Sequence, residues 1–582
     1  MTTMNNYREQ YQRWLDSPAL SDEEWKELSQ ISGDEDEIES RFFAPLEFGT
    51  AGLRGVMGMG IRRMNVHVIR HATQGFAAVI RSRGQEACDR GVVVCYDCRI
   101  HSEDFAREAA CVMAANGIRV RLFDALRPTP ELSFAIRWFG ATAGINVTAS
   151  HNPKEYNGYK VYWSDGAQLP PQQADEVARN MAEIDVFNGV VTMPYQEALD
   201  AGKIELIGGE VDAAFLENVM GQSIDNGPVL RLGEKLKIVY SPFHGAGYRL
   251  VPEALRRLGV RQLIPVPEQM RIDGSFPTVK SPNPEDPAGF EYAIRLAEQT
   301  EATIAIGTDP DSDRVGVAVR DCNGKYVILS GNQVGVLLLD YVITARKAKG
   351  TLPSPALAIK SIVSTEMAKA VCDWHGVRME QTFTGFKFMV ERLAQLEKEG
   401  PTGFLMAFEE SIGYMIGDFV RDKDAVTSSM MIAEMAAWHM ENGRTLLDAL
   451  QELYERVGYF AERTVNLVMP GLDGLETMRA LMAVLRETPP KEICASQVLR
   501  IRDYQSGQVL VPGLGQVETT PISGSNVLYF ELEDGTAFIV RPSGTEPKIK
   551  VYVLARGANG DDCARKAEAY AAYAQTLPEL VK

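Results

Sequence analysis

The sequence predicts an α/β protein made of three similar α/β domains and a smaller C-terminal α+β domain. One pattern of helices and apolar strands occurs three times between about residues 70 and 420, and each time it ends in a polar loop. After about residue 455 the pattern changes to hairpin-forming strands. Strands that alternate with helices are typical of α/β domains. Because the polar loops stand at the same place in each repeat, we expect the domains to face a central cleft.

The chain has 582 residues, too many for one hydrophobic core, so several domains are expected. Polar residues dominate up to about residue 40, where Tyr7, Tyr11 and Trp14 stand at helical spacing. This spacing predicts one or two amphipathic helices that lie on the body of the protein. Next, a glycine-rich loop at 48–55 carries one cation, Arg54, a plan that suits close approach to an anion. A flexible connector is the alternative.

Apolar runs predict the strands of each repeat. They are 92–94, 120–123 and 144–147 in the first, 236–240, 262–264 and 303–307 in the second, and 356–359, 377–380 and 403–407 in the third. A hairpin from 527–532 and 536–540, a strand at 548–554 and an alanine-rich helix are predicted for the last domain. The domain boundaries that we expect are 1–205, 206–325, 326–455 and 456–582.

The loop 148–153, with the sequence TASHNP, stands between a predicted buried strand and the segment 156–160, which predicts a turn. It places Ser150 at the end of a strand, where ligands bind in open α/β sheets. Ala149 and His151 stand where the nucleophile elbow of a hydrolase would have glycines, so that mechanism is excluded. A loop that only caps the next helix is the alternative. The six residues alone do not decide between a ligand site and a cap.

Asp309, Asp311 and Asp313 alternate along the loop after the last strand of the second repeat. An EF-hand would need glycine and an acid where the chain has Arg314 and Arg320. Three carboxylates do not fill the shell of Mg²⁺, which prefers to complete it with water and phosphate oxygens. The arginine beside them favours a site that also holds a phosphate. The alternative is a solvated acidic turn.

Three further loops carry groups that suit a phosphorylated sugar. The segment from Arg541 to Thr545 offers a guanidinium, two hydroxyls and backbone amides, which fits a phosphate cradle as well as a tight connection between strands. Glu409 and Ser411 can bind neutral hydroxyls, although Glu409 also suits a helix N-terminus. A glycine turn at 382–387 adds another cation.

Composition excludes several classes of partner. The formal net charge of −18 argues against nucleic acid, and no apolar run is long enough to span a membrane. The N-terminus lacks the plan of a secretory signal, and eight scattered cysteines fit a reduced, cytoplasmic protein. Cys95 and Cys98 form a C-x-x-C without a second pair, so we expect one core cysteine and one near the loop.

Four motifs in this order, TASHNP, DPDSDR, FEES and RPSGTEP, resemble those of the α-D-phosphohexomutase family. The length, the N-terminal segment and EESIGY are similar to its long-form phosphoglucomutase/phosphomannomutase branch, which includes phosphopentomutases. The resemblance implies four domains around a central cleft: a phosphoserine, a metal-binding, a sugar-binding and a phosphate-binding domain. It implies an isomerase that moves a phosphoryl group between C1 and C6 of a hexose through phospho-Ser150 and a bisphosphate intermediate.

The resemblance also implies a role for each motif residue. The catalytic group would be Ser150, Lys160, Arg54, His151 and Arg314. One Mg²⁺ per chain would be held by Ser150, Asp309, Asp311 and Asp313. Substrate would be bound by Thr384, Gly385, Lys387, Glu409, Ser411, Arg541, Ser543, Gly544, Thr545 and Lys548.

The implied partners are small-molecule sugar phosphates, with glucose 1,6-bisphosphate as activator and a monomer or weak dimer as the assembly. Many relatives have G-E-x-S-G-H at the sugar loop, where this chain has Phe408, Ile412, Gly413 and Tyr414. This departure leaves the choice among glucose, mannose and pentose phosphates open. A metal-dependent sugar phosphatase and a non-catalytic sugar-phosphate sensor are the rival functions.

Overall fold

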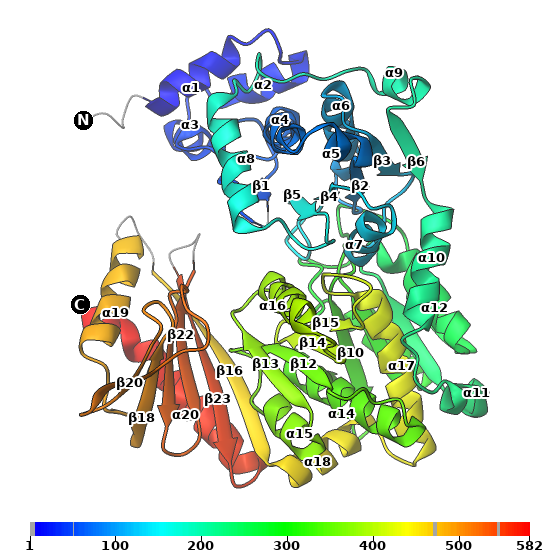
Figure 1. Ribbon diagram of the computed structural model, residues 1–582, viewed down its shortest axis with the longest axis vertical. Coiled ribbons are helices and arrows are strands. Elements are labelled where there is room, and N and C mark those ends of the chain that lie inside the picture. The colour runs from blue at the N-terminus through cyan, green and yellow to red at the C-terminus, as the bar shows by residue number, and fades with distance from the viewer. Residues whose placement is uncertain (1–5, 51, 470–473, 544–547, 582) are drawn as a thin grey trace. The chain divides into compact units, whose positions relative to one another are not determined.

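The computed structural model describes residues 6–50, 52–469, 474–543 and 548–581 (Figure 1). The chain forms two compact units, each considered by itself below. The first unit comprises Met1–Ser330 and Ile412–Asn442, and the second unit comprises Gly331–Ser411 and Gly443–Lys582. The chain therefore leaves the first unit, returns to it for 412–442, and leaves it again.

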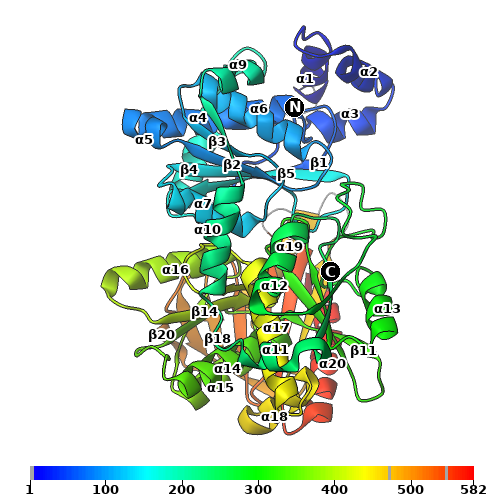
Figure 2. The same cartoon turned by 90° about the vertical axis from the view of Figure 1, so that its right-hand side faces the viewer.

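The first sheet of the first unit has the strand order β1-β5-β4-β2-β3-β6. The pairs among β4, β2, β3 and β6 are parallel, whereas β5 and β1 run antiparallel to their neighbours. Its strands are β1 (Leu53–Val56), β2 (Val92–Tyr96), β3 (Val120–Phe123), β4 (Ala143–Val147), β5 (Tyr156–Trp163) and β6 (Ile204–Ile207). Its helices are α4 (Val66–Ser82), α5 (Gln85–Arg90), α6 (Ser102–Ala115), α7 (Thr129–Trp138), α8 (Pro171–Glu183) and α9 (Tyr195–Asp200). Figures 1 and 2 show α7 on the opposite face of this sheet from α4 and α6, the layering expected of an α/β domain.

The N-terminal segment forms three helices, not the one or two predicted: α1 (Asn6–Leu15), α2 (Asp22–Gln30) and α3 (Glu35–Phe42). The extra break arises because Ser21 and Asp34 each cap a new helix through their side chains. Trp14 is fully buried, with its ring 5.7 Å from that of His67 on α4. The expected packing of this segment on the body is confirmed.

The second sheet of the first unit has the order β11-β10-β9-β7-β8, with β9, β7 and β8 parallel and β10 and β11 antiparallel. The strands are β7 (Lys237–Ser241), β8 (Gln262–Pro265), β9 (Ile304–Thr308), β10 (Val315–Arg320) and β11 (Tyr326–Leu329). The helices are α10 (Gly209–Met220), α11 (Gly227–Leu232), η1 (Gly233–Lys235), α12 (Gly247–Leu258) and α13 (Glu291–Thr300). The returning segment contains β15 (Gly413–Ile416), which is not a strand of this sheet, and the largely buried helix α17 (Ala425–Glu441). Helix α17 packs on α11, α12, β9 and β10.

The second unit begins with three parallel strands in the order β13-β12-β14. They are β12 (Leu357–Ser361), β13 (Arg378–Thr382) and β14 (Phe404–Glu409), and their helices are α14 (Gly331–Lys349), α15 (Met367–His375), α16 (Phe386–Glu399) and α18 (Leu446–Val457). This is the third α/β repeat that the sequence predicts.

An antiparallel sheet completes the second unit, in the order β16-β23-β22-β21-β18-β19-β20, with β17 paired to β18. The strands are β16 (Tyr459–Val468), β17 (Glu492–Ile493), β18 (Ser496–Asp503), β19 (Gln508–Val511), β20 (Gly515–Thr519), β21 (Leu528–Leu532), β22 (Ala537–Pro542) and β23 (Lys548–Gly557). The helices are α19 (Gly474–Glu487), α20 (Gly560–Thr576) and η2 (Leu577–Val581). The predicted fold class, three α/β domains and an α+β domain, is confirmed.

Two local predictions in the first sheet are wrong. Residues 156–160 form the start of strand β5 and not a turn, and Arg54 lies in strand β1 and not in a loop. Asn157 and Gly158 favour a turn locally, but the aromatic residues around them pair with strands on both sides. Gly158 is needed for close packing, since a Cβ atom there would lie 2.5 Å from the Thr148 carbonyl oxygen.

Candidate active site

Ser150 lies in the connection between β4 and β5 and is 3% exposed. Its backbone has a φ of 53°, a left-handed conformation that a serine adopts only when its surroundings impose it. The Ser150 hydroxyl donates a hydrogen bond to Asp309 Oδ2 at 2.9 Å, and His151 Nδ1 lies 3.2 Å from the same hydroxyl. The loop thus points the serine oxygen at a carboxylate of the next domain in sequence.

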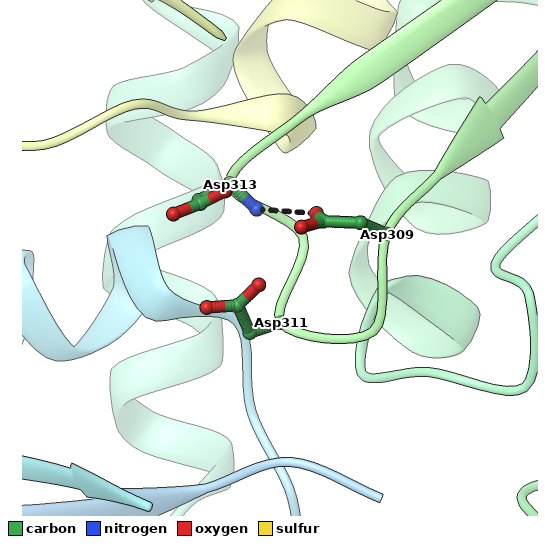
Figure 3. A group of neighbouring side chains, drawn as sticks. All are labelled: Asp309, Asp311 and Asp313. Carbon is green, nitrogen blue, oxygen red and sulfur yellow. Dashed lines mark hydrogen bonds between the residues drawn. The ribbon is translucent and has the colours of Figure 1, made fainter. Parts of the chain in front are cut away.

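Asp309, Asp311 and Asp313 lie in the connection from β9 to β10, and Figure 3 shows their carboxylates gathered there. All three are buried, and one oxygen from each lies within 4.8 Å of the others. Asp309 Oδ1 accepts the N–H groups of Asp313 at 3.1 Å and Arg314 at 3.0 Å, which closes the loop on itself. This folding back lets a short segment present three carboxylates together.

Both oxygens of Asp309 accept hydrogen bonds from the protein, whereas Asp311 and Asp313 each have one oxygen held by donors. Asp311 Oδ2 accepts from Lys160 Nζ at 2.7 Å and from Thr129 Oγ1 at 2.8 Å. Asp313 Oδ2 lies 3.2 Å from Lys423 Nζ and 3.5 Å from Lys160 Nζ. The other oxygens, Asp311 Oδ1 and Asp313 Oδ1, are buried and accept no hydrogen bond from the described residues. Buried carboxylate oxygens left in this way suit a hard divalent cation, so the residues present fit Mg²⁺.

The pKa values of the cluster show how strongly its charges interact. Burial and the charges of Asp311 and Asp313 raise the pKa of Asp309 well above its usual value. Burial alone would raise the pKa of Asp311, but Lys160 lowers it. The pKa of Lys160 is raised because Asp311 and Asp313 outweigh the effect of burial. Lys160 is therefore an ammonium group held between two carboxylates at neutral pH.

Cationic side chains border Ser150. Arg54 Nη1 donates to Asn152 Oδ1 at 3.2 Å, and the Arg314 Nε atom lies 3.7 Å from Asp313 Oδ1. Burial, Arg314 and Arg54 together lower the pKa of His151 to about 2, so its imidazole is neutral at physiological pH. The structure thus brings together all eight residues predicted for catalysis and metal binding, and they belong to one unit.

The sequence analysis missed two groups of polar residues at this site. Lys423 and Asp422 are buried, their side chains lie 3.1 Å apart, and Tyr162 donates to Asp422 at 3.0 Å. The run of alternating charges at 421–424, directly before an apolar helix, could have indicated a buried charged cluster. Thr129, which donates to Asp311, gave no such indication because its Thr-Pro setting is common at helix starts.

The second unit contains the predicted sugar and phosphate loops. Glu410 Oε2 accepts from Ser361 Oγ at 3.1 Å and from Ser364 Oγ at 3.2 Å, which fixes the loop after β14. Arg541 Nη1 donates to the Tyr552 hydroxyl at 3.5 Å. Burial raises the pKa of Tyr552 to about 12, with the nearby Glu410 adding to the effect and Arg541 opposing it. The glutamate loop and the arginine of the phosphate loop therefore lie close together.

Three further predicted substrate residues begin helix α16 or stand just before it. The Thr384 hydroxyl is buried without a partner among the described residues, and Gly385 has a φ of 117°, which favours glycine. Burial lowers the pKa of Lys387, which lies in the helix and not in a turn, 4.9 Å from the Phe388 ring centre. In the phosphate loop, the Ser543 N–H donates to the Lys548 carbonyl at 2.8 Å, whereas Gly544 and Thr545 lie outside the described residues.

Two smaller expectations can also be compared with the structure. Cys95 is buried in β2, Cys98 is partly exposed, and both are free thiols, as expected for a core cysteine and one near the loop. Within the described ranges, no helix is both long enough and apolar enough to cross a membrane.

Four family models match successive parts of the chain. They are the phosphoglucomutase/phosphomannomutase α/β/α domain I at residues 45–187, domain II at 220–324, domain III at 330–457 and the C-terminal domain at 465–562. A phosphoglucomutase of Staphylococcus aureus is 36% identical over 537 residues, which cover 92% of this chain and 94% of that protein. A phosphoglucomutase of Staphylococcus saprophyticus is 34% identical, with 92% and 95% covered.

Two solved structures share the fold. A phosphoglucomutase/phosphomannomutase family protein from Burkholderia thailandensis has a TM-score of 0.64 at 20% identity and covers 92% of this chain and 97% of its own. The parafusin phosphoglucomutase of Paramecium has a TM-score of 0.68 at 15% identity, with 92% and 95% covered. At these identities the likeness concerns the fold alone.

The fold and the site, taken with these relatives, define an isomerase that works by phosphoryl transfer within a sugar phosphate. The chain belongs to the phosphoglucomutase/phosphomannomutase family and is a phosphohexomutase. The resemblance stated from the four motifs is confirmed. The roles of individual residues stay predictions and are argued next.

Proposed function

We propose that the protein interconverts glucose 1-phosphate and glucose 6-phosphate, with phospho-Ser150 as the phosphoryl carrier. The observation that carries this proposal is the Ser150 hydroxyl, 2.9 Å from Asp309 in a buried cluster of three carboxylates. Phosphoglucomutases are the curated relatives at 34–36% identity, which supports glucose as the sugar. Phosphomannomutase and phosphopentomutase activities are the alternatives within the family.

One Mg²⁺ per chain would be held by Asp309, Asp311, Asp313 and the group on Ser150. Its chemistry would be to neutralise the charge of the transferring phosphoryl group. The Oδ2 atoms of Asp311 and Asp313 are held by Lys160, Thr129 and Lys423. These contacts would fix the two carboxylates so that their Oδ1 atoms are available to the cation.

The chain's own residues would act as follows. The free hydroxyl of the sugar attacks the phosphorus of phospho-Ser150, so a sugar O–P bond forms and the Ser150 Oγ–P bond breaks. The hydroxyl proton passes to Ser150 Oγ, and Lys160 is our candidate for the group that relays it. Arg54, Arg314 and the neutral His151 would orient the phosphoryl group and stabilise its charge. The resulting bisphosphate turns over and returns its other phosphate to Ser150 by the reverse of these steps.

In the second unit, Glu409 and Ser411 would bind sugar hydroxyls, while Thr384, Gly385 and Lys387 would bind the adjoining part of the substrate. The cradle for the phosphate that does not react would be formed by Arg541, Ser543, Gly544, Thr545 and Lys548. Charge-assisted bonds from Arg541 suit a phosphate in either orientation of the sugar.

Further parts of the proposal concern the state of the enzyme. Glucose 1,6-bisphosphate would act as activator, because it can phosphorylate Ser150 when the resting enzyme has lost its phosphate. We also propose a cytoplasmic monomer or weak dimer whose partners are small sugar phosphates. The domain boundaries 1–205, 206–325, 326–455 and 456–582 are part of the same proposal.

Phosphorus NMR of a reaction that starts from glucose 1-phosphate tests the function. We expect glucose 6-phosphate and no net free phosphate; release of phosphate would instead indicate a phosphatase, and no change a sensor. Intact-mass spectrometry should place one phosphate on the peptide that contains Ser150. Ser150→Ala should abolish both turnover and the phosphate. The control is Ser429→Ala, because Ser429 is a buried serine without a hydrogen-bond partner among the described residues.

A further inference from the structure

One buried arginine, Arg99, makes unusually many contacts with the loop that carries Ser150. Arg99 follows strand β2, and its side chain is 0% exposed. Its Nη2 atom donates to the carbonyl oxygens of Ser150 and Asn152, both at 2.5 Å. Its Nη1 atom donates to the carbonyl oxygens of Pro153 at 2.9 Å and Tyr156 at 3.1 Å. A single planar guanidinium therefore fixes the backbone path from 150 to 156.

A second set of bonds fixes the same loop from its N–H side. The Ser150 N–H donates to Thr148 Oγ1 at 2.9 Å, and that hydroxyl donates to Asp97 Oδ2 at 2.6 Å. Asp97 Oδ2 also lies 3.3 Å from Arg99 Nε, so the two sets meet in one buried ion pair. Ser150 is thus held at both its N–H and its carbonyl group, and its left-handed φ is imposed from outside the loop.

Residues from the connection between β8 and α13 cover this arrangement. The Phe276 ring lies 5.1 Å from the Arg99 guanidinium carbon. Gly274 packs against the backbone beside Arg99, where an added Cβ atom would lie 2.5 Å from the Cys98 carbonyl oxygen. Ser281 Oγ donates to the His151 carbonyl at 3.0 Å. The guanidinium is shielded from water, so its bonds keep a fixed geometry.

We propose that Arg99, supported by Asp97 and Thr148, is a positioning residue that sets the direction of the phosphoryl group on Ser150. Among the described residues, the Arg99 side chain donates to carbonyl groups of the loop, pairs with Asp97 and lies against Phe276, and none of these contacts involves the Ser150 hydroxyl. Its effect should therefore fall on the rate of transfer and leave substrate affinity intact. The inference rests on the proposed role of Ser150 as the carrier.

The test compares Arg99→Lys with Arg121→Lys. A lysine keeps the charge but cannot reach four carbonyl groups in one plane. Arg121 is a matched control, because it is a buried arginine on β3 that donates to a carbonyl oxygen and stacks on Phe139 at 4.6 Å. We expect Arg99→Lys to lower kcat about 10²-fold, the loss typical of a misplacement of about 1 Å, with KM changed less than about threefold. Arg121→Lys should leave both constants near the wild-type values.

The direct measurement is single-turnover transfer from purified phosphoenzyme to glucose 1-phosphate in rapid quench. The transfer rate constant should fall as much as kcat in Arg99→Lys. Thr148→Val and Thr148→Ser form a second pair, in case the arginine variant fails to fold. Valine removes the hydroxyl and should slow transfer, whereas serine retains it and should restore the rate.

Three outcomes would overturn the inference: normal transfer rates in both Arg99→Lys and Thr148→Val, an equal loss in Arg121→Lys, or a change in KM alone. Wild-type enzyme that carries no phosphate on Ser150 would instead refute the proposed function. The mass of the phosphoenzyme therefore separates the two failures.

Discussion

The carboxylates of Asp309, Asp311 and Asp313 repel one another in a buried site. Because a bound cation would offset this repulsion, we expect activity to depend on the metal. Asp311→Asn should lower kcat/KM on the order of 10²–10³-fold, the range for loss of one preorganised electrostatic contact. Stability should change little, because the variant loses its bond with Lys160 but also loses like-charge repulsion. Activity during a Mg²⁺ titration and the thermal midpoint measure the two effects.

Asp321→Asn is the control for this variant. Asp321 caps the exposed turn between β10 and β11 by accepting the N–H groups of Asn323 at 2.9 Å and Lys325 at 2.8 Å. Its replacement should leave the Mg²⁺ dependence unchanged. Full activity of Asp311→Asn in EDTA-treated buffer would end the metal assignment.

His151 gives a prediction about pH. Its pKa is lowered to about 2 in the folded protein, whereas the unfolded chain binds a proton on this residue near pH 6.5. As pH falls below 6.5, the unfolded state takes up a proton that the folded state does not, so stability decreases. His151→Asn should lose less unfolding free energy between pH 7 and pH 5, by on the order of 1 kcal/mol after allowance for partial solvent exposure.

Urea unfolding of the two proteins at several pH values tests this sign. A wild-type imidazole that titrates near pH 6.5 in a carbon-13 histidine spectrum, with its resonance assigned through His151→Asn, would contradict it. The same spectrum reports whether the imidazole stays neutral where the enzyme works.

At the scale of single residues, the family motifs predict the site more completely than residue chemistry and spacing, which leave an alternative open for each loop. Ser150 and the three aspartates could be found because each lies in a loop that directly follows an apolar strand. The charges at 421–424 could indicate a buried cluster, but not that Lys423 contacts Asp313. Thr129 could not be found, because its importance depends on a contact with Asp311, which is distant in sequence. The same is true of Arg99, whose carbonyl partners lie between residues 150 and 156.

At the scale of elements, the turn predicted at 156–160 is wrong, because these residues begin strand β5. Gly158 in this strand provides a test. A Cβ atom on Gly158 would lie 2.5 Å from the Thr148 carbonyl oxygen and 3.0 Å from that of Leu53. Gly158→Ala should therefore destabilise the protein by roughly 1–3 kcal/mol, the usual cost of overpacking. Kinetics should suffer as well, since Lys160 is two residues further along the strand.

Gly209→Ala is the matched control, because Gly209 begins helix α10 and no atom lies within 4 Å of an added Cβ. Alanine there should be neutral or slightly stabilising. Equal unfolding midpoints for Gly158→Ala and wild type would show that β4 and β1 can move apart at no cost.

The three parallel strands at the centre of each α/β repeat and the strands β21, β22 and β23 are predicted because each is an apolar run. The sequence predicts none of the strands β1, β6, β11 and β15 to β20. The antiparallel strands β5 and β10, which follow the functional loops, were not predicted as continuations of the sheets. Asn157 and Gly158 favour a turn locally, and only the neighbouring strands override that preference. The break between α1 and α2 depends on the Ser21 cap, a feature that helical spacing alone does not reveal.

At the scale of the whole molecule, the proposed phosphate cradle would hold either orientation of the bisphosphate, so its loss should affect the forward and the reverse reaction alike. Arg541→Ala should raise KM for both glucose phosphates roughly 10–100-fold, which corresponds to a loss of about 1.5–3 kcal/mol for a charge-assisted contact. Arg556→Ala is the control. Arg556 lies near the C-terminal end of β23, 5.6 Å from the Phe460 ring centre, whereas Arg541 on β22 is paired with Lys550 near the beginning of β23. An unchanged KM in both directions would remove Arg541 from the cradle.

Local pattern predicted the order of domains but not the division of the chain into units. Each α/β repeat can be recognised from the sequence because its strands and helices follow one another along the chain. The assignment of Ile412–Asn442 to the first unit follows from packing of α17 on α12 and β9, which no local pattern contains. The predicted domain 326–455 therefore does not show that residues 412–442 belong to the first unit.

This return of the chain has a consequence for synthesis on the ribosome. The surfaces of α11, α12 and β10 that α17 covers stay exposed after residue 330 has emerged, until residue 442 follows. At 5–20 residues per second that interval lasts roughly 6–22 s. During it the nascent first unit exposes the apolar surface that α17 later covers, and such surface promotes aggregation. A protein fragment that ends at residue 330 would lack α17, so this surface would stay exposed, and we expect the fragment to aggregate.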